Sequence, residues 1–209
     1  MSKRHFVFDV DDTITDSYAF NQQIFVDGFE PYVDVQDPKI DEYLRTLHSS
    51  YRGKSMYLQF SEAIDHLGLK LDPAKLTRDN ELLQIKKIGQ VKIFDAVEDI
   101  IKTLKDKGCE ISVCSNRGTG SLRKILHKHG LHKYVKNIIS CVEEGHEKPD
   151  PYCLTRLIKD SKLGKTKFLY IGDSRTDYEF AKRAGIDFMI IDHYLNDKKF
   201  YKLMLQAFM

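Results

Sequence analysis

Three aspartates follow a short apolar run near the start of the chain. The run is His5–Phe8, and Asp9, Asp11 and Asp12 come directly after it. Asp9 and Asp11 are two residues apart, so they point to the same side while the chain stays extended. One such carboxylate can act as a nucleophile while its neighbour moves a proton. Neighbouring carboxylates repel each other, so this cluster also predicts a bound divalent cation such as Mg2+.

Two further places along the chain carry groups suited to an anion. Ser115 and Asn116 follow the apolar segment 109–114, and their hydroxyl and amide groups can bind phosphate oxygens. Lys148 stands beside prolines that stiffen its backbone, so it offers a fixed positive charge. The ordinary alternatives are a turn with an asparagine cap and a solvated lysine, and these residues alone leave the choice open.

A second acidic pair follows the apolar segment 168–171. Asp173 and Asp177 are four residues apart near a predicted helix start, where they could hold a metal or simply favour the helix dipole. The carboxyl ends of parallel strands meet at one edge of an α/β sheet, and ligands bind there. The polar residues that follow the predicted strands are therefore expected to form one site.

The second half of the chain alternates between strand and helix patterns. Four short apolar segments, with helical patterns between them, lie at 109–114, 138–140, 168–171 and 188–191. This order predicts βαβ units and an α/β fold with a Rossmann-like parallel sheet. The strand before Asp9 most simply joins that sheet. The tail, residues 196–209, is predicted to be helical.

The stretch 17–90 shows helical spacing and no convincing strand. About four amphipathic helices fit it, and Asp37–Pro38 and Asp72–Pro73 are typical helix starts. Apolar stripes on such helices most often form the core of a bundle. We therefore predict a Rossmann-like core formed by 1–16 and 91–209, with residues 17–90 inserted as a helical cap.

Composition narrows the classes of protein that fit. The chain has 209 residues, of which 42% are hydrophobic and 31% are charged, as in a globular protein. The net charge of +2 gives no reason to expect a nucleic-acid or membrane partner, and no apolar run is long enough to span a bilayer. The four cysteines lack a Cys-x-x-Cys spacing and the start lacks a signal-peptide pattern. We therefore expect free, mostly buried thiols and a cytoplasmic location. For the oligomeric state, the sequence fits a monomer or a homodimer.

Four ordered motifs resemble those of the haloacid dehalogenase-like (HAD) hydrolase superfamily. They are Phe8–Thr13, Cys114–Asn116, Lys148–Pro151 and Ile171–Asp177. The resemblance covers the whole chain, including a helical cap between the first two motifs, and is strongest to the subgroup of phosphoglycolate phosphatase and β-phosphoglucomutase. One departure is Asp12, where relatives usually have glycine; this affects the turn after the strand.

The resemblance implies a role for each matched residue. Asp9 would be the nucleophile that forms an aspartyl-phosphate, and Asp11 would protonate the leaving oxygen and later deprotonate the attacking water. Ser115, with help from Asn116, would hydrogen-bond the transferring phosphoryl group. Lys148 would neutralise charge on Asp9 and the phosphate. Phosphoryl transfer needs such positioning and charge neutralisation above all.

The resemblance also implies a metal site. Mg2+ would be held by Asp9, by the backbone carbonyl of Asp11 and by Asp173, and Asp177 would support its water shell. Mg2+ keeps several waters and takes few carboxylates, which agrees with this set. The predicted function is a Mg2+-dependent phosphatase that hydrolyses a small phosphorylated metabolite.

The segment 51–55 interrupts the helical pattern of the predicted cap. It contains Arg52 and Lys54, and in related caps this region contacts the part of the substrate beyond the phosphate. We predict a loop that reaches toward the site, with both side chains as candidates for binding an anionic or polyhydroxylated substrate. A solvated basic loop explains the pattern equally well.

Three other functions compete with the phosphatase. A receiver-like phospho-acceptor also uses acidic residues, a serine or threonine and a lysine, but it needs no lid such as 17–90. Dehalogenation uses a lone attacking carboxylate without a metal, so Asp11 and Asp173 argue against it. A protein that only binds partners would not need the full set of polar groups.

A phosphosugar mutase of the same superfamily is the fourth alternative. In related mutases a cap histidine about a dozen residues after the nucleophile helps couple closure to acid–base catalysis. Residues 18–23 contain no histidine here, and none lies between His5 and His48. Water should then reach the aspartyl-phosphate, with Asp11 placed to activate it, so hydrolysis is predicted over isomerisation.

Overall fold

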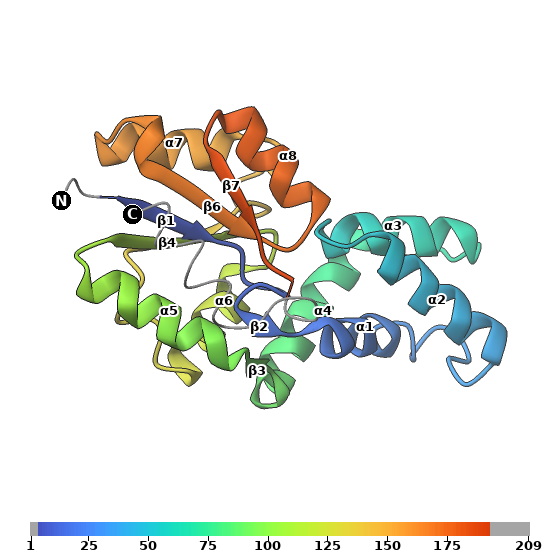
Figure 1. Ribbon diagram of the computed structural model, residues 1–209. Helices are drawn as coiled ribbons and strands as arrows, with labels where there is room; N and C mark the ends of the chain where they lie inside the picture. The colour runs from blue at the N-terminus through green and yellow to red at the C-terminus, as the bar shows by residue number, and fades with distance from the viewer. Residues whose placement is uncertain (1–3, 193–209) are drawn as a thin grey trace.

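A five-stranded parallel sheet forms the centre of the protein in a computed structural model that describes residues 4–192 (Figure 1). The strand order is β5-β4-β1-β6-β7. The bounds are β1 His5–Phe8, β4 Glu110–Ser115, β5 Asn137–Ser140, β6 Phe168–Gly172 and β7 Asp187–Ile190. The first strand of the chain joins this sheet, as the sequence predicts, and takes the central position in it. The predicted helix at 196–209 lies outside the described residues.

Helices cover both faces of this sheet (Figure 1). α5 and α6 pack on one face, and α7 and α8 on the other. Their bounds are α5 Asp95–Asp106, α6 Thr119–Lys128, α7 Tyr152–Ser161 and α8 Arg175–Ala184, with short 3-10 helices η1 Ile88–Gln90 and η2 Lys165–Lys167. Successive side chains of β1 alternate between the two layers: Phe6 and Phe8 pack with α5 and α6, and Val7 packs with α7 and α8. The predicted α/β fold is confirmed.

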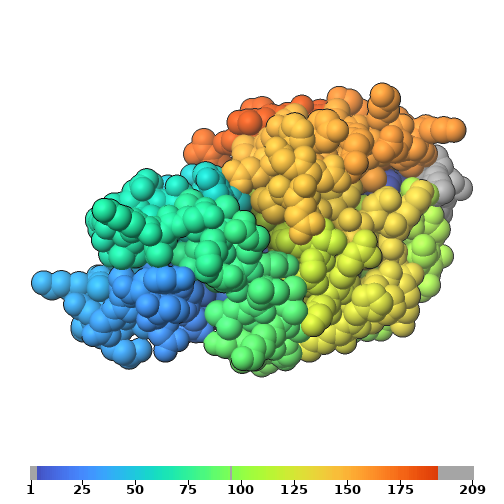
Figure 2. Space-filling model, turned by 180° about the vertical axis from the view of Figure 1, so that it is seen from behind, coloured from blue at the N-terminus to red at the C-terminus, as the bar shows by residue number. Residues whose placement is uncertain are grey.

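Four helices form a cap beside the sheet. They are α1 Tyr18–Asp27, α2 Pro38–Ser50, α3 Met56–His66 and α4 Pro73–Lys87. The carboxylates of Asp37 and Asp72 accept hydrogen bonds from the first turns of α2 and α4, as the Asp-Pro pairs predict. The cap has its own apolar core, in which the rings of Phe25, Phe29 and Phe60 contact one another. Figure 2 shows the cap helices as a lobe beside the core.

A two-stranded antiparallel ribbon lies where the chain enters and leaves the cap. β2 Thr15–Asp16 pairs with β3 Lys92–Ile93. The predicted boundaries of the cap, at 17 and 90, fall beside this ribbon and stay predictions. All four cysteines are buried free thiols. Among residues 4–192, no helix is both long and apolar enough to cross a membrane.

Candidate active site

The three polar strand ends meet at one edge of the sheet. Phe8 of β1 is level with Val113 of β4 and with Ile171 of β6, so the residues that follow these strands emerge together. The backbone N–H of Asp9 still donates to the carbonyl of Ile171, at 2.8 Å, and this bond fixes the start of the aspartate-rich turn. The strand ends therefore lie side by side, as the sequence predicts, and Ser115 is the last residue of β4.

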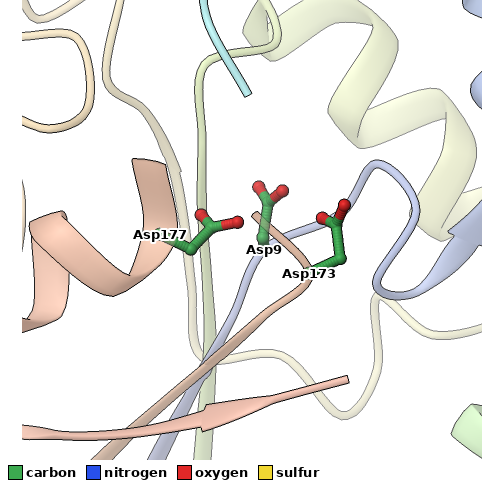
Figure 3. A group of neighbouring side chains, drawn as sticks. All are labelled: Asp9, Asp173 and Asp177. Carbon is green, nitrogen blue, oxygen red and sulfur yellow. The ribbon is translucent and has the colours of Figure 1, made fainter. Parts of the chain in front are cut away.

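Asp9, Asp173 and Asp177 form an acidic cluster at this edge (Figure 3). One carboxylate oxygen from each lies within 4.8 Å of the others. Burial raises the pKa of Asp9 to about 7, and burial and the charge of Asp177 raise the pKa of Asp173 to about 7. All the possible metal ligands in this cluster are carboxylate oxygens, and their mutual repulsion opposes ionisation of the whole cluster. A hard divalent cation would bind such oxygens and offset this repulsion.

Lys148 supplies a buried positive charge to the cluster. Its Nζ lies 2.8 Å from Oδ1 of Asp9 and 2.7 Å from Oδ1 of Asp177, and it donates to the hydroxyl of Tyr170 at 3.2 Å. Burial alone would lower the pKa of Lys148, but the charges of Asp177 and Asp9 raise it well above its usual value. Lys148 is therefore a buried cation paired with two carboxylates rather than a solvated side chain, and its role toward a phosphate stays a prediction.

Asp177 is held in place by the start of α8. Its Oδ2 accepts hydrogen bonds from the backbone N–H and the hydroxyl of Ser174, at 3.1 and 2.6 Å, in a capping box. Its Oδ1 faces Lys148 and Tyr170. Gly172 allows this close packing, because a Cβ there would lie 2.5 Å from Cβ of Asp177. These contacts make Asp177 a support for Lys148 at the edge of the acidic cluster.

Asp11 is bound by Arg117, which the sequence reasoning did not single out. Arg117 donates from Nε to Oδ2 of Asp11 at 2.9 Å and from Nη2 to Oδ1 at 2.7 Å. Oδ1 also accepts from Asn21 at 2.9 Å and from Ser17 at 2.8 Å. Burial would raise the pKa of Asp11, but Arg117 and these hydrogen bonds lower it to about 2.

The guanidinium group of Arg117 also reaches two cap helices. Nη2 donates to Oδ1 of Asn21 on α1 at 2.5 Å, and Nη1 donates to Oε1 of Gln84 on α4. Arg117 itself follows β4 in the core and is only 7% exposed. It therefore joins Asp11 to both the core and the cap.

Asp12 adopts a left-handed backbone conformation, with φ of 56°. Glycine enters this region without cost and aspartate enters it more readily than most residues, which explains why the turn accepts Asp12 where relatives usually have glycine. Its N–H and its Oδ1 both contact Ser17, which steadies the turn.

The cap loop at 51–55 reaches the acidic edge, as predicted. Nη2 of Arg52 lies 2.9 Å from Oδ2 of Asp173 and 3.4 Å from Oδ2 of Asp12. Nζ of Lys54 lies 4.3 Å from the centre of the Tyr51 ring. Arg52 thus pairs with core carboxylates in this structure, and contact of either basic side chain with substrate stays a prediction.

Asn116 connects this loop to the core. Its Nδ2 donates to the carbonyl of Gly53 at 2.9 Å and to the carbonyl of Lys148 at 3.2 Å, and its Oδ1 accepts from the N–H of Lys148 at 2.7 Å. Gly53 has φ of 77°, and a Cβ there would lie 2.7 Å from Oγ of Ser174. The loop needs glycine for its conformation and for its close approach to α8.

A cavity of about 550 Å³ lies between the cap and these core residues. All the predicted site residues except Asp177 line it: Asp9, Asp11, Arg52, Lys54, Ser115, Asn116, Lys148 and Asp173. Ser115 accepts from the N–H of Arg117 at 3.3 Å, and its O–H can donate to a bound anion. The arrangement can hold a phosphoryl group between a buried carboxylate, a lysine and a cation site.

The chain matches one protein family over most of its length. The sequence pattern of the haloacid dehalogenase-like hydrolases matches residues 6–191. The chain belongs to this family. The resemblance carried by the four motifs is therefore confirmed, and the HAD-like hydrolase has the parallel sheet and helical cap that the family relationship implies.

Sequence relatives of this HAD-like hydrolase include phosphoglycolate phosphatases. The enzyme of Vibrio vulnificus is 26% identical over 93 residues, which are 44% of this chain and 41% of that protein. The enzyme of Cereibacter sphaeroides is 32% identical over 98 residues, which are 47% of this chain and 44% of that protein. The matches span less than half of the length of these relatives, so the relationship is distant.

Solved structures agree with the fold over nearly the whole chain. A haloacid dehalogenase-like hydrolase from Bacteroides fragilis has a TM-score of 0.77 at 21% identity, covering 97% of this chain and 93% of that one. The HAD-hydrolase YfnB from Bacillus subtilis has a TM-score of 0.76 at 20% identity, covering 100% of both chains, and its crystal structure contains magnesium. These similarities establish the shared fold.

The HAD-like hydrolase contains site residues that sequence reasoning missed. Arg117 directly follows the Ser-Asn pair of the second motif, and this position was the available signal. Tyr170 sits within an apolar strand and carries no pattern of its own, although its hydroxyl donates to the carbonyl of Cys114 at 2.8 Å behind Lys148. Gln84 lies on a cap helix, far from Arg117 in sequence, so only the folded chain brings the two together.

Proposed function

We propose that this HAD-like hydrolase is a Mg2+-dependent phosphatase that acts on a small phosphorylated metabolite through an aspartyl-phosphate. The observation that carries the proposal is the position of Asp9. It is buried at the end of the central strand, 2.8 Å from Lys148 and within the acidic cluster that contains Asp173. A nucleophilic carboxylate beside a fixed cation and a metal site is what phosphoryl transfer requires.

The proposed reaction has two steps. A carboxylate oxygen of Asp9 attacks phosphorus, the bond from phosphorus to the alcohol oxygen breaks, and Asp11 donates a proton to that oxygen as the alcohol leaves. Water then attacks phosphorus of the aspartyl-phosphate, Asp11 takes a proton from the water, and inorganic phosphate departs with Asp9 restored. Asp11 thus returns to its starting state after each cycle.

The other polar residues hold the phosphoryl group between these events. Lys148 neutralises charge on Asp9 and on the phosphoryl oxygens, and the hydroxyl of Ser115 donates to one of those oxygens. Asn116 keeps Lys148 and the cap loop in place through its three hydrogen bonds. Its contribution to substrate binding is to position these neighbours.

Mg2+ fits the remaining oxygens of the site. Asp9, the backbone carbonyl of Asp11 and Asp173 would hold the ion, and Asp177 would support its water shell. When bound, Mg2+ supplies charge stabilisation to the phosphoryl oxygens. The raised pKa values of Asp9 and Asp173 support this assignment, because a cation would relieve the repulsion that contributes to them.

Replacement of the nucleophile tests the proposal. Asp9→Asn should lower phosphate release from an aryl phosphate at least about a thousandfold, because an amide does not attack phosphorus. Phosphate release with and without Mg2+ measures this, and Asp160→Asn, an exposed change on α7, is the control. Near-normal turnover by Asp9→Asn would rule out the covalent mechanism.

Hydrolysis is proposed over phosphosugar isomerisation. Asn21, which cannot carry a proton at neutral pH, occupies the cap position against Asp11 at 2.9 Å. Incubation with β-glucose 1-phosphate and a bisphosphate primer should therefore give free phosphate if the sugar is used at all. Catalytic formation of glucose 6-phosphate with little free phosphate would instead establish a mutase.

A further inference from the structure

The cavity extends beyond the phosphoryl site and is bounded there by the cap. Apolar and aromatic side chains of the cap line this part of the cavity: Tyr18, His48, Tyr51, Met56, Tyr57 and Leu82. We call these six residues the cap wall. They come from helices α1 to α4 and from the loop at 51–55, so several cap segments converge on one space.

Two polar neighbours of the cap wall are already paired within the protein. Gln59 lies 2.8 Å from His48 through Oε1 and Nδ1. Glu81 accepts from the backbone N–H and the hydroxyl of Ser121 at the start of α6, at 2.8 and 3.2 Å. Groups that are paired in this way offer little to a substrate, so the apolar faces of the wall stay open to it, beside the basic side chains of Arg52, Lys54 and Arg78 that also line the cavity.

Two members of the cap wall are strongly exposed. Tyr57 on α3 is 47% exposed and Leu82 on α4 is 64% exposed, and both line the cavity. Ligand pockets are lined mostly by apolar and aromatic side chains, so these two exposed side chains are available to pack against a ligand. They are not needed for the apolar core of the cap, in which Phe25, Phe29 and Phe60 are fully buried.

We propose that the substrate is a phosphate monoester of a bulky alcohol that carries a flat apolar or aromatic ring. This inference rests on the proposed phosphatase function and specifies its substrate class. The phosphoryl group lies against Asp9 and Lys148, and the ring packs on Tyr57 and Leu82. Phosphoglycolate, with a two-carbon acid beyond its phosphate, is too short to fill a cavity of about 550 Å³ and offers the cap wall no apolar surface.

A matched set of alkyl phosphates tests the substrate class. Ethyl phosphate, phosphoglycolate and 2-phenylethyl phosphate all have alkoxide leaving groups, so differences among their kcat/KM values report mainly the contacts beyond phosphorus. With the full chain and Mg2+, the phenyl ring should raise kcat/KM about tenfold to a hundredfold over ethyl phosphate, as burial of a phenyl-sized group predicts. Equal or better use of phosphoglycolate or ethyl phosphate would overturn the proposal.

Variants of the exposed wall residues locate the effect. Tyr57→Ala and Leu82→Ala should each lower the ratio of kcat/KM for 2-phenylethyl phosphate to that for ethyl phosphate severalfold. Tyr152→Ala and Leu58→Ala are the controls, because these side chains are 45% and 37% exposed and do not line the cavity. An unchanged ratio in both wall variants would overturn the assignment of the ring to this wall.

Binding measurements separate this inference from the proposed reaction. Calorimetric titration of Asp9→Asn with 2-phenylethyl phosphate and with ethyl phosphate, both in Mg2+, tests the ring preference without turnover. Tighter binding of the ring compound, again about tenfold or more, supports the inference even if no phosphate is released. Equal affinities would overturn it, while absence of hydrolysis by the unchanged chain would count against the phosphatase function alone.

Discussion

Arg117 determines the protonation state of Asp11 in this arrangement. The guanidinium group holds both carboxylate oxygens, so Asp11 is ionised at neutral pH and is suited to take a proton from water. To donate a proton to a leaving alcohol, Asp11 must first gain one while Arg117 still holds it in position. The acid step therefore depends on Arg117 more directly than the attack by Asp9 does.

Substitution of Arg117 should separate the two steps. Arg117→Ala should lower kcat/KM for an alkyl phosphate about tenfold to a hundredfold, because a misplaced Asp11 cannot protonate an alkoxide. p-Nitrophenyl phosphate, whose leaving group needs no proton, should lose only a few-fold. Arg123→Ala, an exposed change on α6, is the control. Equal losses on both substrates would indicate a structural role only.

The same variant should change the pH profile. Arg117 lowers the pKa of Asp11, so its removal lets that pKa rise. The acidic limb of kcat, where Asp11 must be ionised to take a proton from the water that attacks the aspartyl-phosphate, should then move to higher pH. Arg117→Lys keeps the charge but cannot bind both oxygens in the same planar geometry, so it should recover only part of the lost activity.

Single residues were predictable from the sequence where local patterns carried them. Asp9, Ser115 and Asp173 follow short apolar runs, and the order of strands brings such ends together. The pairing of Asp11 with Arg117 was not predictable, because the two residues are 106 positions apart and neither has a pattern that names the other. At Asp12 the sequence indicated only that the turn after the strand is affected, and its left-handed conformation is known from the structure.

At the scale of elements, the loop at 51–55 joins the cap to α8. Gly53 combines a positive φ with a close approach to Ser174, and Gly68 has a positive φ of 63° with nothing within 4 Å of a Cβ placed there. Both glycines have a positive φ, but only Gly53 lies against α8. Alanine variants of the two can therefore distinguish the cost of backbone strain from the effect of losing the contact between the loop and α8. Each change to alanine should cost about 1 kcal/mol of unfolding free energy through the backbone alone.

Only the change at Gly53 should affect catalysis. Gly53→Ala should lower kcat/KM about tenfold, because the added methyl group pushes the loop away from the core and opens the site to water. Gly68→Ala should keep near-normal kcat/KM despite a similar loss of stability. Chemical denaturation and phosphate release measure the two effects, and equal kinetics for both variants would show that the docking of this loop is not required.

Element types were more predictable than their connections. Three of the four cap helices, α2, α3 and α4, begin at residues whose side chains cap them, and the strands of the sheet are short apolar runs, so both follow from local sequence. The ribbon of β2 and β3 has only two residues in each strand, which is too short for a pattern of period two. The two strands lie before and after the whole cap in sequence, so their pairing depends on the tertiary structure.

The whole molecule carries a concentration of acidic groups that folding forces together. Asp9 and Asp173 have pKa values of about 7, above the usual value of 3.8, and Lys148 and Arg52 only partly offset their burial. A carboxyl group whose pKa is raised by folding binds more protons in the folded state. Its contribution to stability is complete below about pH 4 and is lost as the pH rises through 7.

Asp11 contributes with the opposite sign and in a different range. Its pKa of about 2 makes its contribution complete above about pH 4, and that contribution is lost only as the pH falls toward 2. Between pH 5 and pH 8, the pH dependence of stability that arises from this site is therefore set mainly by Asp9 and Asp173, whose pKa values are raised.

We expect the metal-free protein to lose thermal stability between pH 5.5 and pH 8, and Mg2+ to restore it mainly at pH 8. The ion needs ionised carboxylates, so at saturating Mg2+, about a hundredfold above Kd, the melting temperature at pH 8 should rise by roughly 5 to 10 °C. The rise at pH 5.5 should be much smaller. Asp173→Asn should flatten the pH dependence and remove most of the Mg2+ effect, whereas Asp160→Asn should change neither. Thermal unfolding of the three proteins, followed by circular dichroism at both pH values with and without Mg2+, measures these effects. An equal Mg2+ effect at both pH values would show that the ion does not bind at the carboxylates whose pKa values are raised.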